Sequence, residues 1–312
     1  MSKVAVVGAG AVGTAIAYAA QIRGVCRELA LFDLNADKVR AEVLDLNHGM
    51  QFTPMARITG SDDLAVCAGA DVIVVTAGAK QRPGQSRLDL AAANVAMFRE
   101  LVPALVELAP ATRLLVVTNP VDVVTYAALK FSGLPTQRVF GSGTVLDSSR
   151  LRFLIAEHTR VAVQNVHAYI AGEHGDSEVP LWSTATIGGV PVQDWGSAGT
   201  GPLDPEARAR IHNRVVTAAY EIIAGKGATS LAIGLAVSRI LEAVLNDEHR
   251  VLPVTSLLDG VHGLSDVCLS MPSVVGRAGV ESVLATPLSA DERHQLVASA
   301  ETVRAAARDL GL

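Results

Sequence analysis

The 312-residue sequence has few aromatic residues, few cysteines and no long run of basic residues. Aromatic side chains make up 4% of the chain whereas half of it is hydrophobic, so Ala, Val and Leu must fill the interior. That composition favours helices packed on a parallel sheet over an aromatic-rich sandwich. The three cysteines are odd in number and far apart. This excludes a disulfide framework and a paired-cysteine metal site, and it favours a reduced, cytoplasmic protein.

The scarcity of positive charge also limits the partners. The formal net charge is -5 and no basic cluster is present, which argues against nucleic acid. The stretch from Val4 to Ile22 carries no charge and resembles a signal peptide or a membrane span. However, Gly8, Gly10 and Gly13 interrupt it, and no other stretch is long enough to cross a bilayer. We therefore expect neither a membrane nor a nucleic acid as a partner.

Short apolar runs alternate with amphipathic segments in the first half of the chain. Runs rich in Val and Leu predict buried parallel strands at Lys3–Val7, Glu28–Phe32, Asp71–Thr76, Arg113–Thr118 and Arg138–Phe140. The segments between them predict helices at Ala11–Arg23, Ala36–Leu46 and Leu88–Leu108. Such alternation is typical of an α/β fold with a doubly wound parallel sheet. We expect this Rossmann domain to span residues 1–143.

The pattern changes after Gly143. Helices are predicted at Val145–Glu157, Asp204–Ala224 and Thr229–Leu245, and strands at Val166–Ala171, Val251–Leu258 and Asp266–Met271. Gly188-Gly189 predicts a hairpin turn, and Ser289 with Glu292 forms a capping box that begins a last helix. We expect residues 144–312 to form an α+β substrate domain, with the active site in the cleft between the two domains.

A glycine motif follows the first predicted strand and opens the first predicted helix, with the sequence Gly8-Ala9-Gly10-Ala11-Val12-Gly13. Glycines at this spacing permit a tight turn, close approach to a pyrophosphate and close packing of helix on strand. The helix N-terminus would then present free N–H groups to the phosphates. The motif predicts a dinucleotide site; the alternative is a turn kept only for packing.

The ends of the predicted strands carry the other candidate cofactor residues. Asp33 ends the second strand, 20 residues after Gly13, where a carboxylate accepts hydrogen bonds from ribose hydroxyls and repels a 2′-phosphate. No arginine adjoins it, so the sequence favours NAD over NADP. Thr76-Ala77-Gly78-Ala79 and Thr118-Asn119-Pro120 end the third and fourth strands. We expect both to line the nicotinamide end, because ligands bind beyond the carboxyl ends of such strands.

A candidate proton-transfer group lies in the second half. His174 stands in the polar turn Gly172-Glu173-His174-Gly175-Asp176, just after an apolar run. Asp147 and Arg150 lie three residues apart on a predicted helix and therefore share a face. From these residues alone, a structural histidine and an internal ion pair on an exposed helix remain open alternatives.

Taken together, these motifs resemble the family of L-lactate and malate dehydrogenases in its bacterial form. The resemblance runs along the whole chain. It rests on the glycine loop with Asp33, Thr76 to Ala79, Pro83-Gly84, Thr118-Asn119-Pro120-Val121-Asp122, Gly141-Ser142-Gly143-Thr144, Asp147, Arg150 and His174. It implies an NAD-dependent oxidoreductase, with Val12 and Lys38 among the cofactor-binding residues and no metal.

The resemblance also implies a role for each polar residue. His174 would donate a proton to a 2-oxo acid and accept it in the reverse direction, with Asp147 orienting the imidazole. Arg150 would bind the substrate carboxylate through two guanidinium hydrogen bonds. Asn119 would contact the substrate near its reacting oxygen, and Arg87 would polarise the ketone from a loop that closes.

The substrate is inferred from the run Lys80-Gln81-Arg82-Pro83-Gly84. Lactate enzymes of the family resemble Gln-basic-Pro-Gly there and malate enzymes Arg-basic-Pro-Gly, so Gln81 implies pyruvate and L-lactate. Oxaloacetate carries a second carboxylate and would need another cation in a closed site. Thr229 matches a threonine beside the substrate methyl group. Malate dehydrogenase remains the alternative, as does, from another class, a non-catalytic NAD(H)-sensing protein.

The resemblance extends to regulation and assembly. Arg152 and His167 match positions that bind fructose 1,6-bisphosphate between subunits in allosteric bacterial members. We therefore expect that effector, a homotetramer in the cytoplasm, and a role in glycolysis as the last step of homolactic fermentation.

Overall fold

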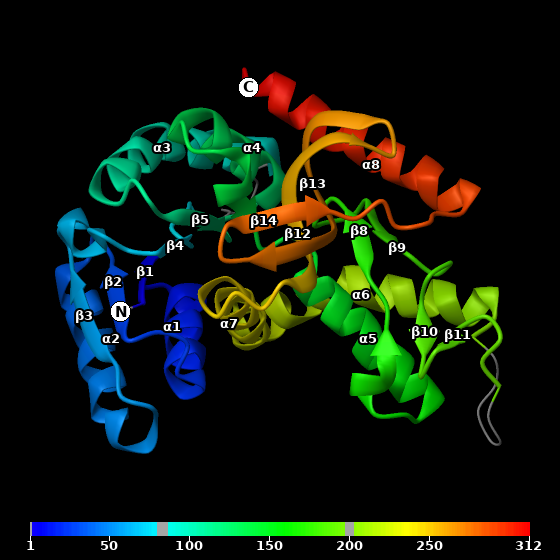
Figure 1. The fold of residues 1–312 in the computed structure, drawn as a ribbon, viewed down its shortest axis with the longest axis horizontal. Coiled ribbons are helices and arrows are strands. Elements are labelled where there is room, and N and C mark those ends of the chain that lie inside the picture. The colour runs from blue at the N-terminus through cyan, green and yellow to red at the C-terminus, as the bar shows by residue number, and fades with distance from the viewer. Residues whose placement is uncertain (1, 80–86, 197–202) are drawn as a thin grey trace.

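The structure is a computed structural model, which describes residues 2–79, 87–196 and 203–312, without the side chains of residues 87 and 88. Its first part is a parallel sheet with strand order β3-β2-β1-β4-β5-β6 (Figure 1). The strands are β1 (Lys3–Val7), β2 (Glu28–Phe32), β3 (Arg57–Ser61), β4 (Val72–Val75), β5 (Arg113–Val116) and β6 (Val139–Gly141). The doubly wound α/β fold predicted from the sequence is confirmed.

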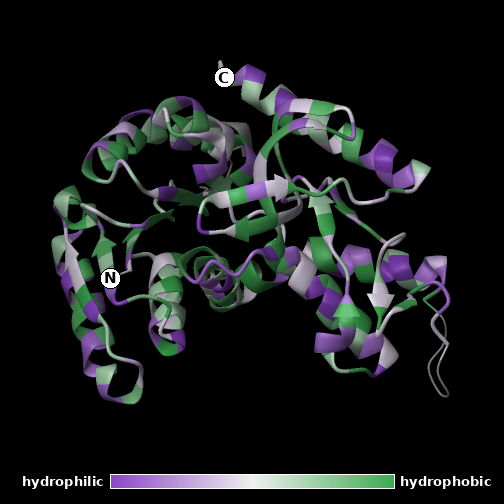
Figure 2. Ribbon diagram, in the orientation of Figure 1, coloured by the Kyte–Doolittle hydropathy of each residue, from purple (hydrophilic) through white to green (hydrophobic). Residues whose placement is uncertain are grey.

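Helices cover both faces of this sheet because its strands alternate their side chains between two cores. Val4 and Val6 pack in the core that contains residues of α1 (Ala11–Arg23) and α2 (Ala36–His48). Ala5 and Val7 pack in the core that contains residues of α3 (Arg87–Leu108) and α4 (Val121–Ser132). Figure 2 shows hydrophilic and hydrophobic residues alternating in bands along the helices.

The sheet continues into the second part of the chain through antiparallel strands. Gly141 of β6 pairs with Thr255 of β12 (Arg250–Val261), and the order then runs β12-β13-β8-β9, with β14 beside β13. The further strands are β13 (Leu264–Gly276), β8 (Ile170–Gly172), β9 (Glu178–Pro180) and β14 (Gly279–Val283). A small separate sheet holds β7 (Val166–His167), β10 (Thr186–Ile187) and β11 (Val190–Pro191).

Four more helices complete the described part of the second half: α5 (Val145–Thr159), α6 (Pro205–Lys226), α7 (Leu231–Leu245) and α8 (Ala290–Asp309). Short 3-10 turns lie at η1 (Met50–Phe52), η2 (Leu64–Cys67), η3 (Thr136–Arg138) and η4 (Val163–Asn165). Helix α7 packs on α1 in the same core as β1, so the two halves are joined by packing as well as by a shared sheet. The predicted capping box is confirmed: Ser289 Oγ accepts from the Glu292 N–H, and Glu292 accepts from the Ser289 N–H.

One sequence interpretation needs correction, and another is confirmed. The single strand predicted at Val166–Ala171 is two strands in different sheets, β7 and β8. Between them the carbonyl of Ala168 accepts a hydrogen bond from Arg152 Nε at 2.8 Å instead of pairing in a ladder.

The uncharged stretch from Val4 to Ile22 forms β1, the glycine loop and α1, as predicted from the sequence. Among the described residues, no helix combines the length and the apolar character that crossing a membrane requires.

Candidate active site

The glycine loop is closed toward the protein and open on its outer side. Gly8 has a φ of +103°, and a Cβ added to it would lie 2.8 Å from the backbone nitrogen of Ala77. A Cβ on Gly13 would lie 1.8 Å from the Gly8 carbonyl oxygen. A Cβ on Gly10 would meet nothing within 4 Å, and α1 begins there without a side-chain cap. The first turn of α1 therefore offers uncapped N–H groups to an anion.

Asp33 lies beside this loop, as the sequence predicts. Its Oδ2 accepts the Ala9 N–H at 2.8 Å and its Oδ1 accepts the Asn35 N–H at 3.0 Å. A carboxylate oxygen can accept more than one hydrogen bond, so Asp33 holds the loop and still has acceptor capacity for a ribose diol. Together, the open face at Gly10 and the partly exposed Asp33 fit an adenine dinucleotide.

The ends of β4 and β5 are tied together by polar side chains. Thr76 Oγ1 donates to the Gly8 carbonyl at 2.9 Å, and Thr118 Oγ1 donates to the Ala77 carbonyl at 2.7 Å. Asn94 of α3 was missed in the sequence, yet its buried amide accepts from the Ala79 N–H at 2.8 Å and donates to the Asn119 carbonyl at 2.7 Å. This amide aligns two segments that are expected to flank the nicotinamide, and only the fold places it there.

His174, Asp147 and Arg150 form one connected group. His174 Nδ1 lies 2.5 Å from Asp147 Oδ2, and Arg150 donates from Nη1 to Asp147 Oδ1 at 2.7 Å. The Asp147 side chain is 3% exposed, against 27% for His174 and 14% for Arg150. The ion pair therefore lies on a buried helix face and not on an exposed one. One buried carboxylate orients both the imidazole and the guanidinium.

This arrangement sets the protonation state of His174. Burial alone lowers the pKa of the imidazole, but the charge and hydrogen bond of Asp147 outweigh it, with a smaller contribution from the charge of Asp122. The pKa of His174 rises from 6.5 to about 9. Burial likewise opposes ionisation of Asp147, yet His174 and Arg150 hold the pKa of that carboxyl below its usual value. At neutral pH the pair is an imidazolium and a carboxylate.

A second buried pair stands next to this group and was not predicted. Glu178 of β9 is 4% exposed, and its Oε1 lies 3.8 Å from Nε2 of His212 on α6. Within the described residues neither atom has a hydrogen-bond partner. Burial, followed by the charge of Asp147, raises the pKa of Glu178 from 4.5 to about 9. Burial lowers the pKa of His212. Glu178 is therefore neutral at pH 7, and nothing in the sequence links it to His212, 34 positions away.

Other predicted residues are placed less completely. Gln81 lies outside the described residues; Arg87 begins α3, but its side chain also lies outside them. Thr229 is half-buried between α6 and α7, while Val12 lies on α1 and Lys38 on α2. Arg152 stacks on the Tyr169 ring at 4.8 Å, and His167, two residues before Tyr169, is exposed on β7.

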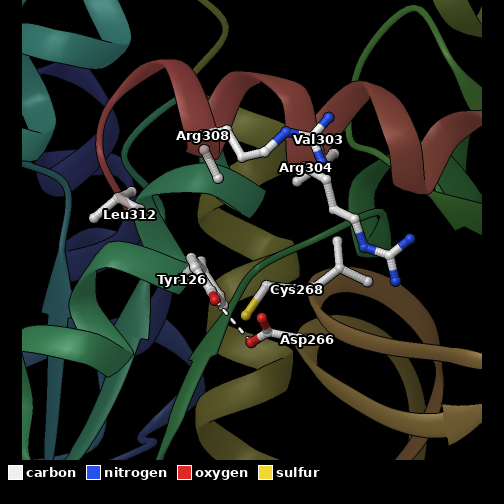
Figure 3. A pocket seen from close by; sticks show the side chains of 9 residues that line it. Tyr126, Asp266, Cys268, Val303, Arg304, Arg308 and Leu312 are labelled. Atoms are coloured by element: carbon white, nitrogen blue, oxygen red, sulfur yellow. Dashed lines mark hydrogen bonds between the residues drawn. The ribbon is translucent and has the colours of Figure 1, made fainter.

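A cavity of about 160 Å³ lies away from this group, between α4, β13 and α8 (Figure 3). Its lining includes Tyr126, Cys268 and Arg304, and Tyr126 donates a hydrogen bond to Asp266 at 2.7 Å. None of the predicted site residues line it. It is therefore not part of the candidate active site.

Known proteins match the chain over its full length. Residues 2–141 match the NAD-binding domain of lactate/malate dehydrogenases and residues 144–310 match the alpha/beta C-terminal domain of the same family. The L-lactate dehydrogenase of Bifidobacterium animalis subsp. lactis is 56% identical over 99% of this chain and 97% of its own length. That of a Synechococcus species is 50% identical over 97% of each chain.

A solved structure agrees with these matches. A lactate dehydrogenase from a Medee basin deep-sea metagenome library superposes with a TM-score of 0.95 at 40% identity, covering 100% of this chain and 99% of its own. The fold, the glycine loop with Asp33 and the His174–Asp147 pair define an NAD-dependent oxidoreductase. The chain belongs to the lactate/malate dehydrogenase family, and NAD is its cofactor.

Proposed function

We propose that the protein is an L-lactate dehydrogenase that interconverts pyruvate and L-lactate. The observation that carries this proposal is the buried Asp147 carboxylate, which holds a protonated imidazole and a guanidinium side by side. These two groups are what a 2-oxo acid needs, namely a proton for its ketone oxygen and a cation for its carboxylate. The relatives named L-lactate dehydrogenase support the same reaction.

In the reduction, bound NADH supplies a hydride to C2 of pyruvate. His174 holds a proton on Nε2 and delivers it to the ketone oxygen, so the imidazole becomes neutral as the hydroxyl forms. Asp147 keeps the other ring nitrogen, Nδ1, hydrogen-bonded throughout and fixes the ring orientation. Arg150 binds the carboxylate through guanidinium nitrogens other than the one bonded to Asp147. The remaining assignments come from the family resemblance: Asn119 near the reacting oxygen, Arg87 on the ketone and Thr229 beside the methyl group.

Gln81 is the residue that we assign to the choice between pyruvate and oxaloacetate. The experiment compares kcat/KM for the two substrates with NADH in the wild type and in Gln81→Arg. We expect the wild type to prefer pyruvate, and the variant to move toward oxaloacetate because the added cation answers the second carboxylate. Gln295→Arg makes the same change on the exposed face of α8 and should alter neither value. Equal or faster turnover of oxaloacetate by the wild type would make the chain a malate dehydrogenase.

A non-catalytic NAD(H)-sensing protein on the same fold is the candidate from another class. A sensor would not need a histidine, an aspartate and an arginine joined at one buried carboxylate. If NADH absorbance falls on addition of pyruvate, and does not fall with His174→Ala, the chain is a catalyst and not a sensor. If NADH binds but its absorbance does not fall, the chain is a sensor.

We also infer that fructose 1,6-bisphosphate acts on Arg152 and His167. Arg152 Nε binds the Ala168 carbonyl next to His167, which supports a shared basic position at one surface of the subunit. The test compares pyruvate saturation curves with and without the bisphosphate at several pH values. Arg152→Gln should remove any activation, whereas Arg210→Gln, an exposed change on α6, should keep it. Identical wild-type curves would remove the proposal.

The remaining assignments are proposals that rest on the family. We place the domain boundary at Gly143 and infer a cytoplasmic homotetramer that acts in glycolysis, at the last step of homolactic fermentation. Light scattering on the purified chain, with and without the bisphosphate, measures the oligomeric state. A monomer under both conditions would contradict the proposed homotetramer.

A further inference from the structure

Asp122 is a buried carboxylate that the proposed reaction does not use. It lies in the first turn of α4 and is 2% exposed. Its Oδ2 accepts the backbone N–H of His174 at 2.7 Å, and its Oδ1 accepts the Thr255 hydroxyl at 2.5 Å. Burying a charge is costly unless it is hydrogen-bonded, and here both oxygens are bonded. The carboxylate thus joins the start of α4 to the loop that carries the proton donor.

A chain of hydroxyl groups extends this contact to α5. Thr255 Oγ1 lies 3.0 Å from Ser270 Oγ, and Ser270 Oγ accepts the Thr144 N–H at 3.1 Å. Thr144 is the residue immediately before α5, the helix that carries Asp147. Asp122 is therefore connected, through β12 and β13, to the helix that orients the same imidazole. All members of this chain are buried.

The position of Asp122 in α4 ties this network to the substrate side. Asn119 lies three residues earlier, just before α4 begins, and its carbonyl is held by Asn94. The hydrogen bond from His174 to Asp122 therefore sets the distance between the proton donor and the segment expected to contact the reacting oxygen. A shift of about 1 Å between such groups can cost a factor of about 100 in rate.

Asp122 also adds charge near the imidazole. The charged or titratable groups that face His174 come from α5, α4 and β9; they are Asp147, Arg150, Asp122 and Glu178, and Glu173 adjoins Asp122 in the loop. Burial raises the pKa of Asp122 to about 6, opposed by its bonds to Thr255 and His174. The carboxylate is therefore ionised at neutral pH, and its charge favours the imidazolium.

We propose that Asp122 is a positioning residue for proton transfer, which fixes the His174 backbone relative to Asn119 and α5 and supplies a second negative charge to the imidazole. The role rests on the proposed dehydrogenase reaction and adds to it a group that acts through His174. The two parts of the role can be separated. Asp122→Asn keeps an oxygen that accepts the His174 N–H but removes the charge, whereas Asp122→Ala removes both.

The test measures two independent quantities. One is the pKa of His174 from the pH titration of its imidazole proton resonances, identified as those missing in His174→Gln. The other is the pH dependence of kcat and KM for pyruvate with NADH. The titration needs no turnover, so a chain that fails to reduce pyruvate refutes the proposed function and still tests the role of Asp122. Tyr126→Phe is the matched control, because it removes the part-buried hydrogen bond of a hydroxyl one turn further along α4, at the separate cavity (Figure 3).

We expect both Asp122 variants to lower the pKa of His174 by about one unit, because an opposing charge within a few ångström shifts a pKa by one to three units. The alkaline limb of kcat should move by the same amount. Asp122→Ala should also lose kcat by about a further tenfold to hundredfold. Tyr126→Phe should change neither the pKa nor kcat.

Three results would overturn the proposal. The first is an unchanged His174 pKa in Asp122→Asn, and the second is equal kcat in the Asn and Ala variants at a pH where the imidazole is fully protonated. The third is a change in melting temperature alone with wild-type kinetics, which would make Asp122 a merely structural residue. If Asp122→Ala does not fold, Thr255→Val replaces it, since that change removes the other partner of the carboxylate and should lower kcat by about tenfold.

Discussion

Replacing Asp147 by Asn tests the central electrostatic argument. The carboxylate contacts His174 Nδ1 and Arg150 Nη1 with one oxygen each and is nearly inaccessible to water. The Asn side chain keeps the shape and removes the charge. We expect the pKa of the His174 imidazole to fall, because burial then has the largest effect and burial favours the neutral ring.

The size of the effect follows from the pKa of His174. Asp147, with a smaller contribution from Asp122, raises that pKa from 6.5 to about 9 against the effect of burial, a difference of about 3 kcal/mol between the two protonation states. Without Asp147 we expect a pKa below about 7, so that at pH 7.5 at most about a quarter of the enzyme carries the proton. Loss of ring orientation adds to this, and kcat/KM for pyruvate should fall by about 100-fold to 1,000-fold.

The assay records loss of NADH absorbance at saturating NADH between pH 5.5 and pH 10, which are about the limits set by the expected pKa values. The alkaline limb of kcat/KM for pyruvate should begin near pH 9 in the wild type and about two units lower in Asp147→Asn. Ser149→Ala, at an exposed position of α5, is the control and should leave the limb in place. If the alkaline limb of Asp147→Asn stays within about half a pH unit of the wild-type limb, Asp147 does not set the pKa of His174.

Four further substitutions test other parts of the structure. Glu178→Gln should raise the melting temperature by about 5 °C more at pH 8 than at pH 5. The reason is that the folded chain keeps the Glu178 proton up to a pKa of about 9, whereas the unfolded chain loses it above 4.5. An equal change in melting temperature at both pH values, measured by calorimetry, would contradict this. Gly13→Ala should lower the melting temperature, since its Cβ would meet the Gly8 carbonyl oxygen. Gly10→Ala should keep the melting temperature and weaken NADH binding about tenfold or more. Similar melting temperatures for the two variants would contradict this prediction. Asp33→Ser should raise KM for NADH by at least about tenfold and reduce the preference for NADH over NADPH. Unchanged kinetics with both cofactors would disprove the assignment of Asp33 to the ribose.

The sequence predicted elements well where the signal is local. The bounds of α1 follow from the glycine loop before it and from Gly24, a left-handed C-cap, after it. The capping box at Ser289 is equally local. By contrast, β3 was missed because it is an edge strand with Ile58 as its one buried residue. Helix α4 was missed although all residues from Val121 to Ala128 are buried, the polar Asp122 and Thr125 included.

The same distinction holds for the site. The sequence supplied Asp33, Asp147, Arg150 and His174 because these residues stand in motifs of short range. It did not supply partners that the fold brings together from a distance: Asn94 bonds Asn119 across 25 positions and Asp122 bonds His174 across 52. Such contacts have no signature in a single sequence, because each depends on how two elements pack. Burial is what makes these contacts energetically significant.

The charges around the imidazole bear on the choice of substrate. At neutral pH the His174–Asp147 pair and the described charges that act directly on it comprise two cations, the His174 imidazolium and Arg150, and two carboxylates, Asp147 and Asp122. Glu178 adds nothing because its pKa of about 9 keeps it protonated. A site balanced in this way accepts one substrate carboxylate when one further cation closes over it, the role we propose for Arg87. A second carboxylate would remain uncompensated in a buried site, at a cost of several kcal/mol. The balance therefore favours a monocarboxylate such as pyruvate independently of the loop sequence at residues 80–84, and it requires Glu178 to stay neutral.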